Sequence, residues 1–92
     1  MKKDWFLYLI QAENGKIYTG ITKDIERRFL EHTQGKKGAK FFRSSAPQEV
    51  LYLVAKLSHS QALKLEYQIK KLPRKKKLAI ISRQSHKPAT KR

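Results

Sequence analysis

The pair Asn14-Gly15 separates two apolar segments, residues 5–10 and residues 17–22. Asparagine and glycine tolerate the positive φ angles of a tight turn, so this pattern predicts a β-hairpin. The first segment is apolar without alternation, which is typical of a strand covered on both faces. The rest of the chain must therefore pack against a hairpin whose first strand is buried.

The length of the hairpin loop decides whether the tyrosines of the two strands share a face. A two-residue turn would pair Tyr8 with Ile21 and leave Tyr18 on the opposite face. A three-residue loop over residues 13–15 instead pairs Tyr8 with Gly20, because a shift of one residue reverses the facing of every side chain. We expect this second register, in which Gly20 leaves room for a phosphate to approach the backbone. The alternative is a pair of core tyrosines with hydrogen-bonded hydroxyls.

A helix, a loop and a third strand are expected after the hairpin. Thr22 or Asp24 can cap the first helix, and Gly35 supplies the left-handed residue that ends it. Residues 35–47 then form a loop rich in glycine, serine and basic residues. Residues 50–57 are β-branched and apolar, which predicts a central or covered strand.

Two further helices are expected near the C-terminus. Ser58 and Gln61 have the spacing of a capping box, which predicts a second helix that extends to Leu72. Residues 75–81 predict a short third helix that presents its aliphatic side chains to the body of the protein.

The order β-β-α-β-α-α indicates a small α+β fold, a three-stranded antiparallel sheet flanked by helices. The chain has 92 residues, which is enough for one domain with one core region. We expect that domain over residues 1–82 and a flexible basic tail over residues 83–92.

The chain carries a strong excess of positive charge, with 22 Lys and Arg residues against 7 Asp and Glu residues and a formal net charge of +15. Such a surface favours nucleic acid, since lysines that neutralise phosphates release counterions. A solubilising surface and a ribosome-associated protein are the alternatives. The cations form two clusters, the first of which surrounds phenylalanines that either stack on bases or anchor the loop. The clusters are Lys36, Lys37, Lys40 and Arg43 around Phe41 and Phe42, and Lys70, Lys71, Arg74, Lys75, Lys76 and Lys77.

The chain contains no cysteine, which excludes a disulfide framework and a thiolate zinc site and favours a reducing compartment. The longest apolar run, residues 5–10, is far shorter than the ~20 residues of a membrane span. We therefore expect a soluble cytoplasmic protein without a membrane partner, and we expect it to be a monomer.

Two expected helices place polar groups where a core would be. Ile25, Arg28, Phe29 and His32 follow the spacing of one helix face, so Arg28 and His32 are expected to line a cleft that borders the sheet. The alternative is a helix edge from which the arginine reaches solvent.

Glu66 belongs to the buried stripe of the second helix, whose apolar members are Ala62, Leu65 and Ile69. A carboxylate among apolar neighbours needs a cation, which is Arg28, a lysine or a metal ion. A purely structural bridge between Glu66 and an arginine is the alternative interpretation.

These residues together resemble the GIY-YIG nuclease domain of certain homing endonucleases and of one subunit of the bacterial excision-repair incision enzyme. The similarity covers roughly residues 4–82 and is greatest to small stand-alone bacterial proteins of this family. The segments that carry it are Leu7-Tyr8-Leu9, Tyr18-Thr19-Gly20, residues 24–32 and Leu65-Glu66-Tyr67.

The resemblance implies a metal-dependent endonuclease that acts on DNA. In the implied assignment, Glu66 holds one divalent cation, Mg²⁺ or Mn²⁺. Tyr18 is the general base that takes a proton from the attacking water, and Arg28 stabilises charge in the transition state. Tyr8 and His32 orient the nucleophile or the scissile phosphate. A larger protein partner could supply specificity.

Two positions depart from the family pattern. Several active members have a lysine after the second half-motif, where this chain has Ile21. Many members also have an asparagine beyond the acidic helix, whereas Asn14 is the only asparagine here. The alternative to a nuclease is therefore a nucleic-acid-binding module of the same fold that does not cut.

Overall fold

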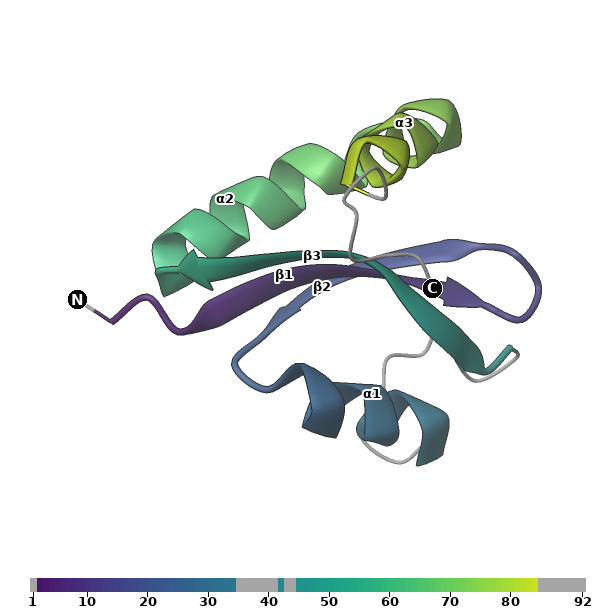
Figure 1. The fold of residues 1–92 in the computed structure, drawn as a ribbon, viewed down its shortest axis with the longest axis horizontal. Coiled ribbons are helices and arrows are strands. Elements are labelled where there is room, and N and C mark those ends of the chain that lie inside the picture. Colours follow the sequence, from purple (N-terminus) through teal and green to yellow (C-terminus); the bar gives the residue numbers. More distant parts are fainter. Residues whose placement is uncertain (1, 35–41, 43–44, 85–92) are drawn as a thin grey trace.

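The computed structural model describes residues 2–34, 42 and 45–84. Within these residues it contains a three-stranded antiparallel sheet and three helices, which confirms the predicted fold class and order. The elements are β1 (Trp5–Ala12), β2 (Ile17–Thr22), α1 (Ile25–Gln34), β3 (Pro47–Leu57), α2 (His59–Lys70) and α3 (Arg74–Gln84). The sheet separates two layers, with α1 on one side and α2 and α3 on the other (Figure 1).

The hairpin between β1 and β2 has the longer of the two possible loops. The Ala12 N–H donates a 2.8 Å hydrogen bond to the Lys16 carbonyl across this loop. Gly15 has a φ of +89°, the left-handed conformation that the loop requires. Tyr8 consequently pairs with Gly20, which confirms the predicted register.

β1 is the central strand, with β2 on one side and β3 on the other. Residues 7–10 are all buried, as expected for a strand covered on both faces. A central position for the third strand was wrong, because β3 pairs with β1 alone in the described part of the chain. β3 begins at Pro47, which lacks an N–H for a ladder and is therefore suited to the first residue of an edge strand.

The side chains of β1 alternate between two buried clusters because successive residues of a strand face opposite ways. One cluster lies between the sheet and α1, and the other lies between the sheet and the α2–α3 layer. The buried members are Tyr8, Ile10, Ala12 and Phe42 on the α1 side, and Leu7, Leu9 and Ile69 on the α2 side.

Both predicted N-terminal caps are present. The Arg27 N–H donates to Asp24 Oδ1 at 3.1 Å, and the Asp24 N–H donates to Thr22 Oγ1 at 3.1 Å, so both candidate residues shape the start of α1. At α2, the Gln61 N–H donates to Ser58 Oγ at 3.1 Å and the Ser58 N–H donates to Gln61 Oε1 at 2.9 Å. This reciprocal pair confirms the capping box.

The C-terminal helix is longer than predicted. Arg83 and Gln84, which were assigned to the tail, are the last residues of α3. The Gln84 amide accepts a 3.0 Å hydrogen bond from the Leu53 N–H and donates a 2.9 Å bond to the Leu53 carbonyl. The tail therefore cannot begin before residue 85, and residues 85–92 lie outside the described ones. None of the described helices is long and apolar enough to cross a membrane.

Candidate active site

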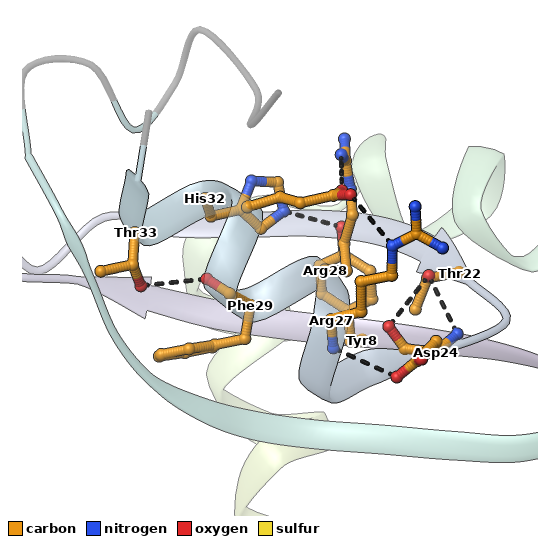
Figure 2. A network of polar contacts seen from close by, with 9 residues as sticks. Tyr8, Thr22, Asp24, Arg27, Arg28, Phe29, His32 and Thr33 are labelled. Atoms are coloured by element: carbon orange, nitrogen blue, oxygen red, sulfur yellow. Dashed lines mark hydrogen bonds and ion pairs between the residues drawn. The ribbon is translucent and has the colours of Figure 1, made fainter. Parts of the chain in front are cut away.

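Tyr8 and His32 form a buried pair on the α1 side of the sheet. Tyr8 Oη lies 3.0 Å from His32 Nε2, and each residue is only 1% exposed. Figure 2 shows the two side chains meeting between α1 and β1. The expectation that His32 lines a cleft bordering the sheet was therefore wrong. Its imidazole belongs to the core because the Tyr8 hydroxyl satisfies one of its nitrogens there.

Two more rings enclose this pair. The ring centroids of Tyr18 and Phe42 lie 5.4 Å and 4.5 Å from that of His32. Phe42 is 5% exposed, which confirms the interpretation that it anchors its loop to the core. Phe41 lies outside the described residues. The structure thus brings Tyr8, Tyr18 and His32 into one aromatic cluster.

Gly20 fits closely between the two phenols. A Cβ atom at this position would collide with Oη and Cζ of Tyr8, and it would lie 2.9 Å from Cε2 of Tyr18. The expectation that Gly20 leaves room for a phosphate is therefore wrong, because the phenol of Tyr8 fills that space. The glycine is needed for close packing of the tyrosines instead.

Burial sets the protonation states of the pair. It raises the pKa of Tyr8 from 10.0 to about 12, against the opposing effect of a hydrogen bond from Arg28. Burial, followed by the nearby Arg28 charge, lowers the pKa of His32 from 6.5 to about 4. Both groups are thus neutral at neutral pH. Since a guanidinium can only donate, Tyr8 Oη accepts from Arg28 and the Tyr8 hydroxyl can donate its proton to His32.

Arg28 is held by the carboxylate of Glu31, which was not among the site residues predicted from the sequence. Its Nη1 lies 2.9 Å from Glu31 Oε1, and Nε of Arg27 lies 3.4 Å from the other carboxylate oxygen. The signal for these pairs is their helical spacing of three and four residues. The alternative in which Glu66 serves as the structural partner of an arginine was wrong, because Glu66 pairs with a lysine.

Glu66 belongs to the other layer. It is on α2, its side chain is 19% exposed, and its Oε2 lies 3.3 Å from Lys70 Nζ. Burial is the largest of the causes that raise the pKa of Tyr8, and the charges of Tyr18 and Glu66 add to it. The lysine that was one of the expected partners of Glu66 is thus present as Lys70.

The sequence matches the GIY-YIG catalytic domain over residues 4–79. The chain belongs to the GIY-YIG family. It is similar to small bacterial proteins named UPF0213, one of which, from Cupriavidus pinatubonensis, is 45% identical over 83 residues that cover 90% of this chain and 91% of the relative. Another, from Staphylococcus saprophyticus, is 40% identical over 77 residues and covers 84% of this chain and 93% of its own.

A solved structure supports the same grouping. The solution NMR structure of the UPF0213 protein BH0048 from Bacillus halodurans has a TM-score of 0.55 and 36% sequence identity with this chain. The match covers 85% of this chain and 82% of that one. In this GIY-YIG domain the two half-motifs are on β1 and β2, where they supply Tyr8 and Tyr18, whose ring centroids lie 6.2 Å apart.

GIY-YIG domains typically use a divalent metal. The described residues include no group of three or more His, Cys, Asp or Glu side chains able to enclose one. A single half-buried carboxylate, Glu66, suits Mg²⁺ or Mn²⁺, because Mg²⁺ is commonly bound through one or two carboxylates together with water and substrate phosphate. The donor set therefore fits such an ion and does not fit structural zinc.

The second basic cluster of this GIY-YIG domain extends from the end of α2 into the start of α3. Lys71 Nζ lies 4.3 Å from the centroid of the Tyr67 ring, and Arg74 donates a 2.8 Å hydrogen bond to the Gly15 carbonyl. The cluster thus begins on the helix that carries Glu66. The other predicted cations, Lys36, Lys37, Lys40 and Arg43, lie outside the described residues.

Proposed function

We propose that this protein is a metal-dependent endonuclease that hydrolyses phosphodiester bonds in DNA. The observation that carries the proposal is the contact among the two half-motif tyrosines and the arginine and histidine of α1. Tyr8 Oη lies 3.0 Å from His32 Nε2 and accepts a hydrogen bond from Arg28, and the ring centroids of Tyr8 and Tyr18 lie 6.2 Å apart. Family membership supports a nucleic-acid substrate. The net charge of +15 supports binding to a polyanion.

Tyr18 is our candidate for the general base. It is half-buried, whereas Tyr8 is fully buried with a pKa raised to about 12, so Tyr18 is the phenol that a water molecule can approach. An ordinary phenol has a pKa of about 10, so it needs nearby positive charge to lose its own proton and act as a base at neutral pH. Arg28 donates a hydrogen bond to the phenol of Tyr8, whose ring centroid lies 6.2 Å from that of Tyr18.

Arg28 is our candidate for stabilising the charge that develops on the scissile phosphate. Its planar guanidinium suits two phosphate oxygens. The Glu31 carboxylate and the Tyr8 hydroxyl both bond to it and thereby fix its orientation. Tyr8 and His32 are 1% exposed, so we assign them to positioning this arginine rather than to direct contact with substrate.

Glu66 is our candidate metal ligand. A divalent cation bound there would supply Lewis-acid polarisation of the phosphate and charge for the departing 3′ oxygen. Lys70 pairs with one oxygen of this carboxylate, Oε2, at 3.3 Å, so an ion bound by Glu66 would share the carboxylate with the lysine or displace it.

The test is cleavage of labelled single-stranded, duplex and branched DNA with Mg²⁺ or Mn²⁺. We expect Glu66→Gln and Arg28→Lys to reduce cleavage at least ~100-fold, as removal of one transition-state donor does elsewhere. Binding should persist in both variants. Glu13→Gln, which changes an exposed carboxylate of the hairpin loop, is the matched control and should cut normally. Cleavage that survives in both site variants would refute the assignment.

A second candidate function is nucleic-acid binding without cleavage. Ile21 packs into the α2-side cluster, where several active relatives would have a lysine. Asn14, the only asparagine, accepts a 3.0 Å bond from the Lys16 N–H in the hairpin loop. Salt-sensitive binding to every DNA form, with no cleavage under either metal, would favour this second function.

A further inference from the structure

An aromatic pair lies on the surface outside the site described above. The indole of Trp5, at the start of β1, stacks on the imidazole of His59, at the start of α2. The ring centroids are 4.4 Å apart and the planes are inclined by 24°. Lys23 Nζ lies 5.8 Å from the centroid of the indole ring and 4.0 Å from Asp4 Oδ2. A ring pair with an adjacent cation is the combination that binds unpaired bases.

The fold makes little use of this pair. Neither ring belongs to the two buried clusters, Trp5 is only partly buried, and His59 is exposed. His59 is also the first residue of α2, where a histidine gains nothing from the helix dipole. The proposed chemistry likewise leaves both rings without a role.

The helix geometry of α2 places this pair in line with the candidate metal ligand. His59, Leu63, Glu66 and Lys70 stand at i, i+4, i+7 and i+11, which is one stripe of a helix. Leu63 is 46% exposed although it is apolar. The seven residues from His59 to Glu66 correspond to about 10 Å along the axis. The stripe thus has rings and an apolar side chain on one side of the carboxylate.

The other side of Glu66 has the opposite character. Lys70 pairs with the carboxylate at 3.3 Å, and exposed cations continue through Lys71 and Arg74. α2 lies along the sheet from the end near the N-terminus to α3, and the stripe follows this helix (Figure 1). A nucleic-acid strand that lies along this stripe of α2 meets aromatic rings on one side of the Glu66 carboxylate and basic side chains on the other.

We propose that the Trp5–His59 stack is a nucleobase-binding subsite of the active site. An unpaired base stacks on the exposed His59 ring, within about three nucleotides of the phosphate at Glu66, given ~3.4 Å per stacked nucleotide. Beyond the phosphate, the strand is held by its backbone on Lys70 and its neighbours. The substrate is therefore unpaired on the His59 side. This inference rests on the proposed function, because it places the scissile phosphate at Glu66.

The test separates base contacts from phosphate contacts without using cleavage. Fluorescein-labelled oligothymidylate of twelve nucleotides and a base-free deoxyribose-phosphate oligomer of the same length are titrated with the full chain in the absence of metal. We expect the thymidine oligomer to bind about tenfold more tightly, as for one stacked base. It should also quench the emission of Trp5, which is the only tryptophan. His59→Ala should reduce the tenfold preference to less than threefold.

The control variant is Ser60→Ala, which changes an exposed neighbour of His59 on α2 and should leave the preference unchanged. Equal affinity of the wild type for the two oligomers would overturn the subsite, whether or not the protein cuts DNA. A preference that His59→Ala leaves intact would also overturn it, even if that variant is less stable. A preserved base preference without any metal-dependent cleavage would overturn the proposed function alone.

Discussion

Among single residues, His32 shows how burial couples this site to pH. The pKa of His32 is about 4 in the folded protein and 6.5 ordinarily, so the unfolded chain takes up its proton first as the pH falls. The stability that comes from keeping His32 neutral is complete above pH 6.5 and is lost as the pH falls toward 4. The difference between the two pKa values corresponds to about 3 kcal/mol of folding free energy at most.

We therefore expect the free energy of unfolding, measured with urea between pH 4 and 7.5, to fall on acidification with a slope that His32→Gln reduces. Ser60→Ala changes an exposed uncharged residue of α2 and should leave that slope as it is in the wild type. The comparison therefore isolates the burial of His32. An unchanged slope in His32→Gln would contradict the role of its burial.

Two glycines allow a matched comparison of space and backbone conformation. Gly20→Ala would press a Cβ against both tyrosine rings and should destabilise the protein by about 1–3 kcal/mol. Gly15→Ala has open space around it but a φ of +89°, so it should cost a similar ~1–2 kcal/mol through backbone strain alone. Thermal unfolding and cleavage assays should show that both lose stability while only Gly20→Ala loses cleavage. Full cleavage by Gly20→Ala would show that the tyrosine packing is dispensable.

For whole elements, the free edge of β3 is covered at one point by a side chain. The Gln84 amide bonds to both backbone groups of Leu53. Gln84→Ala should cost about 1–3 kcal/mol, because two hydrogen bonds are lost. It should also speed hydrogen exchange at the Leu53 amide. Gln48→Ala, an exposed change on the same strand, should do neither. Equal exchange in both variants would show that Gln84 does not protect the edge.

Lys56, near the end of β3, has a φ of 61° within an irregular part of the β1–β3 pairing. A left-handed conformation costs a residue with a Cβ roughly 1–2 kcal/mol, so Lys56→Gly should raise the free energy of unfolding by about 1 kcal/mol. The same substitution at exposed Lys64, inside α2, should lower it by about 1 kcal/mol. Urea denaturation should therefore show changes of opposite sign in the two variants, and a loss of stability in Lys56→Gly would contradict the strain assigned to Lys56.

The sequence predicted those features that depend on near neighbours. The loop length, the register of Tyr8 opposite Gly20 and the α2 capping box all follow from residues close in the chain. The edge position of β3 and the contact between Gln84 and Leu53 did not, because each depends on which distant segments pack together. The burial of His32 was missed for a related reason. Its polarity indicated a cleft, and only the three-dimensional structure shows that Tyr8 satisfies it.

In the molecule as a whole, the candidate chemistry and the described basic cluster are on different elements. Arg28 and His32 are on α1 and the two tyrosines are on β1 and β2, while Glu66 and the described basic cluster are on α2, on α3 and between them. Figure 1 shows α1 on one side of the sheet and α2 and α3 on the other, so a nucleic acid that contacts all of these residues meets both layers. Its affinity should come mainly from phosphate contacts, whose strength falls with salt by about 0.9 log units per neutralised phosphate for each log unit of salt.

This division predicts that the position of a charge matters more than net charge. Replacing Lys75 and Lys76 by glutamine takes the formal charge from +15 to +13, since two cations are lost. Replacing Lys56 and Lys64 by glutamine gives the same formal charge of +13, since two cations are again lost from +15. The first pair of substitutions should make the slope of log affinity against log salt for duplex DNA less steep by about 2, because two phosphate contacts are removed. The second pair should change the slope little. Equal slopes in both double variants would mean that the protein binds DNA as a diffuse polycation, without an oriented surface next to Glu66.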